Sequence, residues 1–418
     1  CGVVKAGEWV NAHRREAAEV LAPRARLKLE EALVFVNYFD YTVTFNDASV
    51  DELRGVERFF RGKGIITGPI NYRTLVRPEF LEAVDPLRVL ITGDNATLLG
   101  RDDPLKAAAP ARLLGPVEVG SGIDAAYAQF VVAERHGFWK ACGVDVRLKL
   151  FPSGQEALEG VLANRVAMTL NGQANHPIAH SKGGKVYMVA ENERSGTQFG
   201  AAGVGIKGPK DLEGKAVGTQ FGTSPEYHMR RYFEHYGLDA SRITVKNVQF
   251  ADLMPALAKG DIQAFFAFDP HLTRAAKEVP QATVFHRSGE DNVFFLRTYL
   301  GVSESVVSDP KLAQALVCGV VKAGEWVNAH RREAAEVLAP RARLKLEEAL
   351  VFINYFDYTV TFNDVSVDEL RGVERFFRGK GIITGPINYR MLVRPEFLEA
   401  VSPSRVLVTG DNATLLGR

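Results

Sequence analysis

The fold is decided by residues 117–151, VEVGSGIDAAYAQFVVAERHGFWKACGVDVRLKLF, which read as a strand, a helix and a second strand. Val117–Ser121 and Val144–Phe151 have the apolar or alternating character of strands. Between them, Ala125–His136 has the spacing of an amphipathic helix, and Gly137 ends it. A strand, a helix and a strand in this order predict a parallel pair with a right-handed crossover.

The alternation continues through the rest of the chain. We expect a helix over Glu156–Ala163, a strand over Ala167–Leu170, a helix from Pro177 and a parallel strand over Lys185–Ala190. A second series follows Gly200. Its expected strands are Lys215–Gly218, Thr244–Val248, Ala264–Phe268 and Ala282–His286, and its expected long helices are Pro225–Tyr236 and Phe250–Lys259. We expect a further strand over Thr298–Val302 and helices beyond Pro310. Together these elements predict two α/β lobes followed by a helical carboxy-terminal segment.

An internal repeat changes the domain count. Residues 1–101 recur as 318–418 at a constant offset of 317. The copies differ at six positions: Val36/Ile353, Ala48/Val365, Thr74/Met391, Asp85/Ser402, Leu87/Ser404 and Ile91/Val408. In each copy a capping-box pattern, Ser49 with Glu52 and Ser366 with Glu369, predicts where a helix begins.

The start of the repeat falls inside an expected helix. Ser308 or Asp309 can cap that helix and Pro310 suits its first turn, so it runs through Cys318. We expect residues 102–418 to form one complete unit and residues 1–101 to be the carboxy-terminal third of a preceding unit. The alternative is an arm that packs on another chain and mediates self-association.

Composition and charge restrict the partners. The chain has 51 Lys plus Arg and 50 Asp plus Glu, and its net charge of +1 argues against nucleic acids and anionic membranes. No apolar run approaches the roughly 18 residues that span a bilayer. The three cysteines, Cys1, Cys142 and Cys318, have no CxxC spacing for zinc and cannot build a disulfide framework. We expect Cys142 and Cys318 to be buried, inert thiols.

Candidate ligand contacts lie where the expected strands end, because open parallel sheets bind ligands at their carboxyl ends. Asp124 and Tyr127 follow the first strand, Asn171 and Gln173 the third, and Glu191 and Asn192 the fourth. Asn171-Gly172 could equally be a turn.

Further candidates lie in the second lobe. Gly222, Thr223 and Ser224 stand before Pro225 at the amino end of a long helix, where free N–H groups favour an anion, or where Thr223 or Ser224 is an ordinary N-cap. Asp269 either hydrogen-bonds a ligand or caps the helix that begins at Pro270.

Several segments, in order, resemble the periplasmic substrate-binding proteins of the nitrate/sulfonate/taurine class of ABC importers, which include thiamine-pyrimidine relatives. The segments are Tyr127–Trp139, Leu170–Gly183, Gly208–Gly218, Gly222–Tyr227, Gly260–Pro270 and Tyr299–Glu304. Trp139 stands where the family usually has Phe.

The resemblance implies a two-lobed periplasmic binding protein type II fold with a helical carboxy-terminal segment, preceded by its duplicate. It assigns lobe 1 to residues 116–200 plus 296–418, lobe 2 to 201–295, and a linker to 102–115. It implies a periplasmic receptor that captures a small organic anion, a sulfonate or carboxylate, in an interlobe cleft and delivers it to an ABC permease. No signal peptide is visible before Cys1.

The same resemblance leaves an enzymatic alternative, since the fold also serves desulfinases with a nucleophilic Cys and pyrimidine synthases with a Cys-rich motif. The chain has no HExxH, P-loop or GxSxG pattern. We therefore expect no catalytic residue, metal or cofactor. A sensor domain that serves a signalling partner is a third hypothesis.

Overall fold

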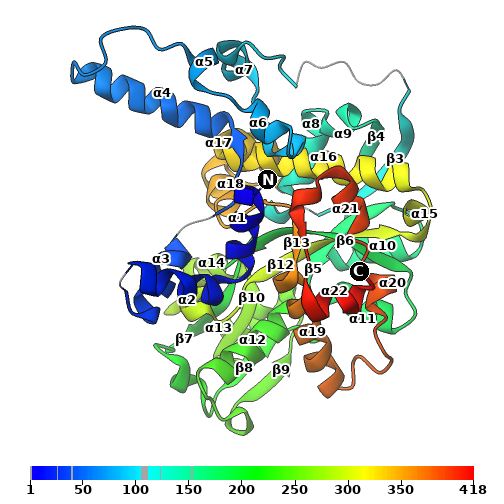
Figure 1. The fold of residues 1–418 in the computed structure, drawn as a ribbon. Helices are drawn as coiled ribbons and strands as arrows, with labels where there is room; N and C mark the ends of the chain where they lie inside the picture. The colour runs from blue at the N-terminus through cyan, green and yellow to red at the C-terminus, as the bar shows by residue number, and fades with distance from the viewer. Residues whose placement is uncertain (1, 26, 39–40, 105–111, 123, 152–153) are drawn as a thin grey trace.

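The computed structural model describes residues 2–25, 27–38, 41–104, 112–122, 124–151 and 154–418. Two five-stranded sheets with helices around them form two lobes, and a helical segment from each end of the chain lies against the first lobe or beside it (Figure 1). Cys1 and residues 105–111 of the expected linker lie outside the described residues. The α/β fold class predicted from the sequence is confirmed.

The first sheet has the strand order β4-β3-β5-β12-β6. β3 pairs in parallel with β4 and β5, as expected, but β12 runs antiparallel between β5 and β6. The prediction that the fourth strand continues a directly paired parallel series is therefore wrong. β12 lies between β5 and β6 and is buried along most of its length. The strands are β3 Leu114–Ser121, β4 Val144–Leu150, β5 Met168–Gly172, β6 Val186–Ser195 and β12 Leu296–Ser303.

The helices of this lobe follow the expected order. Residues 128–133 of α8 are all buried, because the helix packs on β4 of the sheet and on helices of the carboxy-terminal segment, and Gly137 follows its end in a left-handed conformation. The helices are η2 Ala125–Tyr127, α8 Ala128–Arg135, α9 Phe138–Ala141, α10 Gly154–Leu162 and α11 Asn175–Ser181.

The second sheet has the order β11-β7-β10-β8-β9, and β7 runs antiparallel to both its neighbours. β7 was not predicted, because its Gly and Ala residues have weak strand propensity. Its glycines fit a crowded site, since a Cβ on Gly203 would lie 2.8 Å from the Gln263 carbonyl oxygen. The elements are β7 Phe199–Val204, η3 Pro209–Leu212, β8 Ala216–Thr219, α12 Ser224–His235, η4 Ala240–Arg242, β9 Thr244–Asn247, η5 Phe250–Asp252, α13 Leu253–Lys259, β10 Ala264–Phe268, α14 His271–Glu278, β11 Ala282–Arg287 and η6 Glu290–Asn292.

The carboxy-terminal segment returns to the first lobe as helices. Asp309 caps α16 by accepting from the backbone N–H groups of Lys311 and Leu312, as predicted. The predicted start of α19 is wrong: its capping box joins Asn363 and Ser366, so the helix begins before Ser366. Of the helices that the structure describes, none is both long and apolar enough to cross a membrane. The elements are α15 Glu304–Val307, α16 Pro310–Ala329, α17 Arg331–Ala342, α18 Leu346–Ile353, β13 Phe362–Asn363, α19 Asp364–Gly379, α20 Tyr389–Leu392, α21 Glu396–Val401, η7 Pro403–Arg405, β14 Val406–Leu407 and α22 Gly410–Leu416.

The first copy of the repeat folds into the same succession of elements. It packs beside the second copy, while α4 extends away from the body of the molecule (Figure 1). The elements are α1 Gly2–Ala12, α2 Arg14–Ala25, α3 Leu29–Tyr38, β1 Phe45–Asn46, α4 Asp47–Gly62, α5 Tyr72–Leu75, α6 Glu79–Glu82, η1 Pro86–Arg88, β2 Val89–Leu90 and α7 Gly93–Leu99.

Cys142 and Cys318 form a disulfide between the end of α9 and the middle of α16. The prediction of two inert thiols is therefore wrong. The two residues are 176 positions apart, so only the packing of α9 on α16 brings them together. Pairings over such a distance cannot be deduced from spacing.

We expect reduction of this disulfide to lower the free energy of unfolding by about 2–4 kcal/mol, because a cross-link restricts the unfolded chain. Thermal melting with and without dithiothreitol measures the loss. The double variant Cys142→Ser/Cys318→Ser is the control and should melt at the temperature of the reduced protein in either buffer. A wild-type melting temperature that does not respond to the reductant would contradict the expectation.

Candidate functional site

Two short crossovers join the lobes. One runs from the end of β6 at Ser195 to Phe199, and the other from the end of β11 at Arg287 to Leu296. They touch where the backbone N–H of Gly289 donates to the Gly196 carbonyl oxygen at 2.6 Å. A Cβ on either glycine would lie about 3 Å from the other's backbone, so the contact requires glycine. A pair of crossovers is the kind of segment about which two lobes can rotate.

The lobes meet at the amino end of α12. The Ser224 hydroxyl accepts a hydrogen bond from the backbone N–H of Ala174 at 3.4 Å, and Ser224 is 3% exposed. A Cβ on Gly172 would lie 2.7 Å from the same hydroxyl oxygen. Gly172 and Ser224 therefore place the end of β5 directly against α12.

A carboxylate of the protein itself, that of Glu226, binds at the amino end of α12. The backbone N–H of Gly222 donates to Glu226 Oε2 at 2.8 Å, and Gly222 has a φ of 74°. The Thr223 hydroxyl donates back to the Gln220 carbonyl oxygen at 2.6 Å, so it does not cap the helix. Buried Glu226 also pairs with Lys380, which directly follows α19. The N-cap role considered for Thr223 and Ser224 is thus not realised by either hydroxyl.

A charged cluster lies beside this contact. Arg297 Nη1 and Glu191 Oε1 are 2.5 Å apart, and the Ser366 hydroxyl donates to Glu191 Oε2 at 2.7 Å. Gln173 Nε2 donates to Glu369 Oε1 at 3.3 Å. Burial raises the pKa of Glu369, and the positive charge of Arg297 opposes that shift. The cluster joins β5, β6 and β12 to α19.

Three of the expected strand-end residues, Asn171, Glu191 and Asn192, lie inside strands. Asn171 of β5 pairs with Tyr299 of β12. β6 continues through Glu191 and Asn192 to Ser195. The turn considered for Asn171-Gly172 is therefore wrong, as is the end of the fourth strand at Ala190. Both strands extend because β12 supplies hydrogen-bonding partners along them.

A second buried group surrounds Asp124. Its carboxylate accepts from the backbone N–H of Ala126 at 2.9 Å, and burial of the carboxyl group raises the pKa of Asp124 to about 6 although the residue keeps some exposed surface. The Tyr127 hydroxyl donates to the Leu170 carbonyl oxygen at 2.9 Å. Burial, reinforced by the charge of Asp124, raises the pKa of Glu193 well above its usual range.

Asp269 is buried, with partners in the second lobe and one, Tyr355, in the carboxy-terminal segment. Its Oδ1 accepts from the backbone N–H and the hydroxyl of Thr273, and its Oδ2 pairs with Arg287 Nη1 at 2.7 Å. The two hydrogen bonds from Thr273 place Asp269 at the first turn of α14, so they agree with the capping alternative.

The structure brings some sequence candidates together and separates others. Tyr127 and Asn171 meet at Gly154, whose carbonyl oxygen accepts from Asn171 Nδ2 at 2.7 Å. Gln173 and Ser224 flank the lobe contact, while Asp269 pairs with Thr273 and Arg287 and also bonds to Tyr355. Among the described residues, Asn171 Oδ1 and Asn192 Oδ1 are buried without a hydrogen-bonding partner. Such oxygens can accept from a ligand that carries a donor.

Arg297 was not predicted as a site residue, and Glu369 was predicted only as part of a capping box. Arg297 is flanked by Leu296 and Thr298 in a largely apolar strand, which is a weak signal for a buried charge. Glu369 lies in the second turn of α19, and nothing in its sequence neighbours indicates that it faces Gln173.

Solved structures with this fold include solute-binding proteins. SsuA from Escherichia coli, a periplasmic aliphatic sulphonate binding protein, is 16% identical and aligns over 68% of this chain and 99% of its own, with a TM-score of 0.58. NrtA from Synechocystis PCC 6803, a periplasmic nitrate-binding protein, is 13% identical over 70% and 89%, with a TM-score of 0.56. The expected periplasmic binding protein fold is confirmed.

The same fold is seen in DszB in complex with biphenyl-2-sulfinic acid, which is 16% identical over 69% of this chain and 99% of its own, with a TM-score of 0.53. A comparison with curated protein sequences finds no match. The family model described as NMT1/THI5 like matches residues 124–334, which make up half of the chain. The chain therefore belongs to the NMT1/THI5-like family.

Proposed function

We propose that the chain is a solute-binding receptor that captures a small organic anion, a sulfonate or carboxylate, between its lobes and delivers it to an ABC permease. The observation that carries the proposal is the contact of two α/β lobes, joined by two crossovers, at polar residues of β5, β6 and α12. The sulfonate- and nitrate-binding proteins named above share this architecture. Rotation about the crossovers would open the contact and expose Asn171, Gln173 and Ser224 to a solute.

A periplasmic location fits the disulfide between Cys142 and Cys318, because disulfides persist in oxidising compartments. The domain division proposed here assigns residues 116–200 and 296–418 to lobe 1 and 201–295 to lobe 2, with the linker at 102–115.

The enzymatic alternative has one specific observation in its favour, the buried carboxyl groups of Asp124 and Glu193 with raised pKa. Against it, Cys142 and Cys318 are bonded to each other, so neither is a free thiol nucleophile. We therefore favour binding without turnover.

Isothermal titration of the full chain with taurine, methanesulfonate, acetate and nitrate tests the proposal. We expect saturable binding of an organic anion and recovery of that compound unchanged. Conversion of the ligand would favour an enzyme, and an absence of binding across all four compounds would sink the receptor hypothesis for this ligand class.

The variant Gln173→Ala tests the place of binding. We expect its affinity to fall about 10- to 100-fold, because a hydrogen bond to a charged group contributes about 1.5–3 kcal/mol. Gln249→Ala, at an exposed position of the second lobe, is the matched control and should bind as the wild type does. Melting curves check that Gln173→Ala is folded, and an unchanged affinity would place the ligand elsewhere.

A further inference from the structure

The two copies of the repeat touch through reciprocal histidine–aspartate contacts. His13 Nε2 of the first copy lies 3.5 Å from Asp364 Oδ2 of the second. In the opposite sense, His330 Nε2 of the second copy lies 3.2 Å from Asp47 Oδ2 of the first. With the offset of 317, both pairs join the same two positions of the repeat.

A second reciprocal set is buried. Arg88 Nη2 donates to the Ser404 carbonyl oxygen at 3.2 Å, and Arg405 Nη2 donates to the Leu87 carbonyl oxygen at 3.3 Å. Positions 87 and 404 are equivalent, as are Arg88 and Arg405. The elements follow the same rule, since α1 packs on η7 and β14 while α16 packs on η1 and β2. An interface in which residue i contacts j and j contacts i is isologous, the arrangement of a twofold dimer.

The local twofold axis passes near position 85 and its equivalent, 402. Asp85 Oδ2 accepts hydrogen bonds from the hydroxyls of Ser402, at 2.5 Å, and Ser404. Asp85 and Ser402 are both fully buried. Position 85 therefore faces its own counterpart, and two of the six differences between the copies fall at this contact.

Identical copies would place two carboxylates here. Asp85 opposite a second aspartate would bring like charges together in a buried site, which is strongly unfavourable. Arg88 Nε lies 3.4 Å from Asp85 Oδ2 and offsets part of its charge. Arg88 and Arg405 are each also paired with a glutamate of their own copy, Glu8 and Glu325, at 2.7 Å, so a second aspartate would set two arginines against four carboxylates. Ser402 removes the second charge and supplies a donor instead.

We infer that the repeated segment carries a dimer-type interface whose partner is the unlike copy. A segment with Asp85 and Leu87 pairs with a segment that has Ser402 and Ser404, and the charge at the axis disfavours pairing of two aspartate copies. The interface therefore binds the second copy, which belongs to a two-lobed unit, to a segment that has Asp85 and Leu87.

The full chain with Ser402→Asp tests this inference. We expect amide hydrogen exchange in α1 to speed up about tenfold or more, because the charge pair loosens the packing of the first copy. Exchange in β10 of the second lobe is the internal reference and should not change. Wild-type protection of α1 in Ser402→Asp would overturn the inference.

A fourfold swap separates pairing from general damage. The variant Asp85→Ser/Leu87→Ser/Ser402→Asp/Ser404→Leu exchanges the residues of the two copies, so that an aspartate again faces a serine across the axis. We expect α1 protection to return to within about threefold of the wild type, since the same groups meet across the axis. A swap variant as unprotected as Ser402→Asp would show that the axis charge does not select the partner.

Discussion

Replacing Gly319 by alanine should destabilise the protein by about 1–3 kcal/mol or more, because the new methyl group has no space. Its Cβ would lie 2.1 Å from Trp139 Cδ1. Trp139 is 1% exposed, and its Nε1 donates to the Leu316 carbonyl oxygen at 3.0 Å, so the ring cannot move aside without losing packing and a hydrogen bond. Chemical or thermal unfolding measures the loss.

Gly2→Ala is the matched control for this variant. Gly2 occupies the equivalent position of the first copy, and a Cβ there meets no atom within 4 Å. The change should be neutral or slightly stabilising, since alanine favours a helix by up to about 1 kcal/mol over glycine. Equal losses at the two positions would contradict the different environments of the copies.

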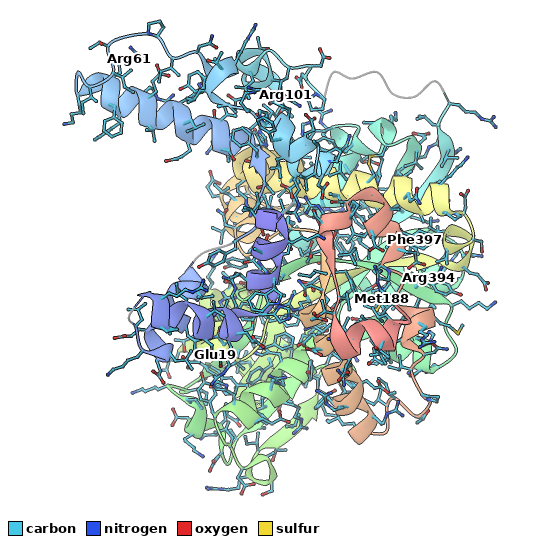
Figure 2. The ribbon with its side chains drawn as sticks, in the orientation of Figure 1. Glu19, Arg61, Arg101, Met188, Arg394 and Phe397 are labelled. Atoms are coloured by element: carbon cyan, nitrogen blue, oxygen red, sulfur yellow. A yellow bond between two sulfur atoms is a disulfide. The ribbon has the colours of Figure 1, made fainter. Side chains whose placement is uncertain are left out.

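Truncating Phe397 to alanine should cost about 3–5 kcal/mol, the usual loss for a buried aromatic side chain. Phe397 is 4% exposed in α21, which packs on α16 and β6. Its neighbour Arg394 donates its backbone N–H to the Met188 carbonyl oxygen of β6 at 2.8 Å (Figure 2). The loss should appear in unfolding of the first lobe.

Phe80→Ala removes the same side chain from the first copy, where it is 69% exposed, and should change stability by no more than about 0.5 kcal/mol. The local contacts match, since Arg77 lies 5.3 Å from the Phe80 ring and Arg394 lies 5.5 Å from the Phe397 ring. Phe80 instead lines a groove of about 420 Å³ with Leu53 and Leu75. A large loss at Phe80 would mean that this groove is covered in solution.

The order of strands and helices could be predicted from local patterns, as α8, α12 and α16 show. The failures are equally specific. β7 is built of small residues without a clear strand signal, and the direct neighbour of β5 is β12, which arrives from a distant part of the chain. Strand partners are chosen by surfaces that form only on folding, so alternation along the sequence cannot identify them.

For the same reason, only part of the site could be predicted from the sequence. Asn171, Gln173 and Ser224 do lie near the lobe contact, because strand ends and helix ends converge there in such folds. Arg297 and Glu369 come from elements that close over the contact later in the chain, and their roles depend on Glu191 and Gln173 across the sheet.

The sequence by itself determined most of the elements, their order, the repeat and the family, because these depend on neighbouring residues and on recurring motifs. Only the tertiary structure decided which surfaces are buried, which cysteines pair and which charges meet. Phe80 and Phe397 have the same neighbours in sequence but differ from 69% to 4% in exposure. The difference arises because burial is a property of the surface that packs against a residue, and β6 and α16 cover only the second copy at this position.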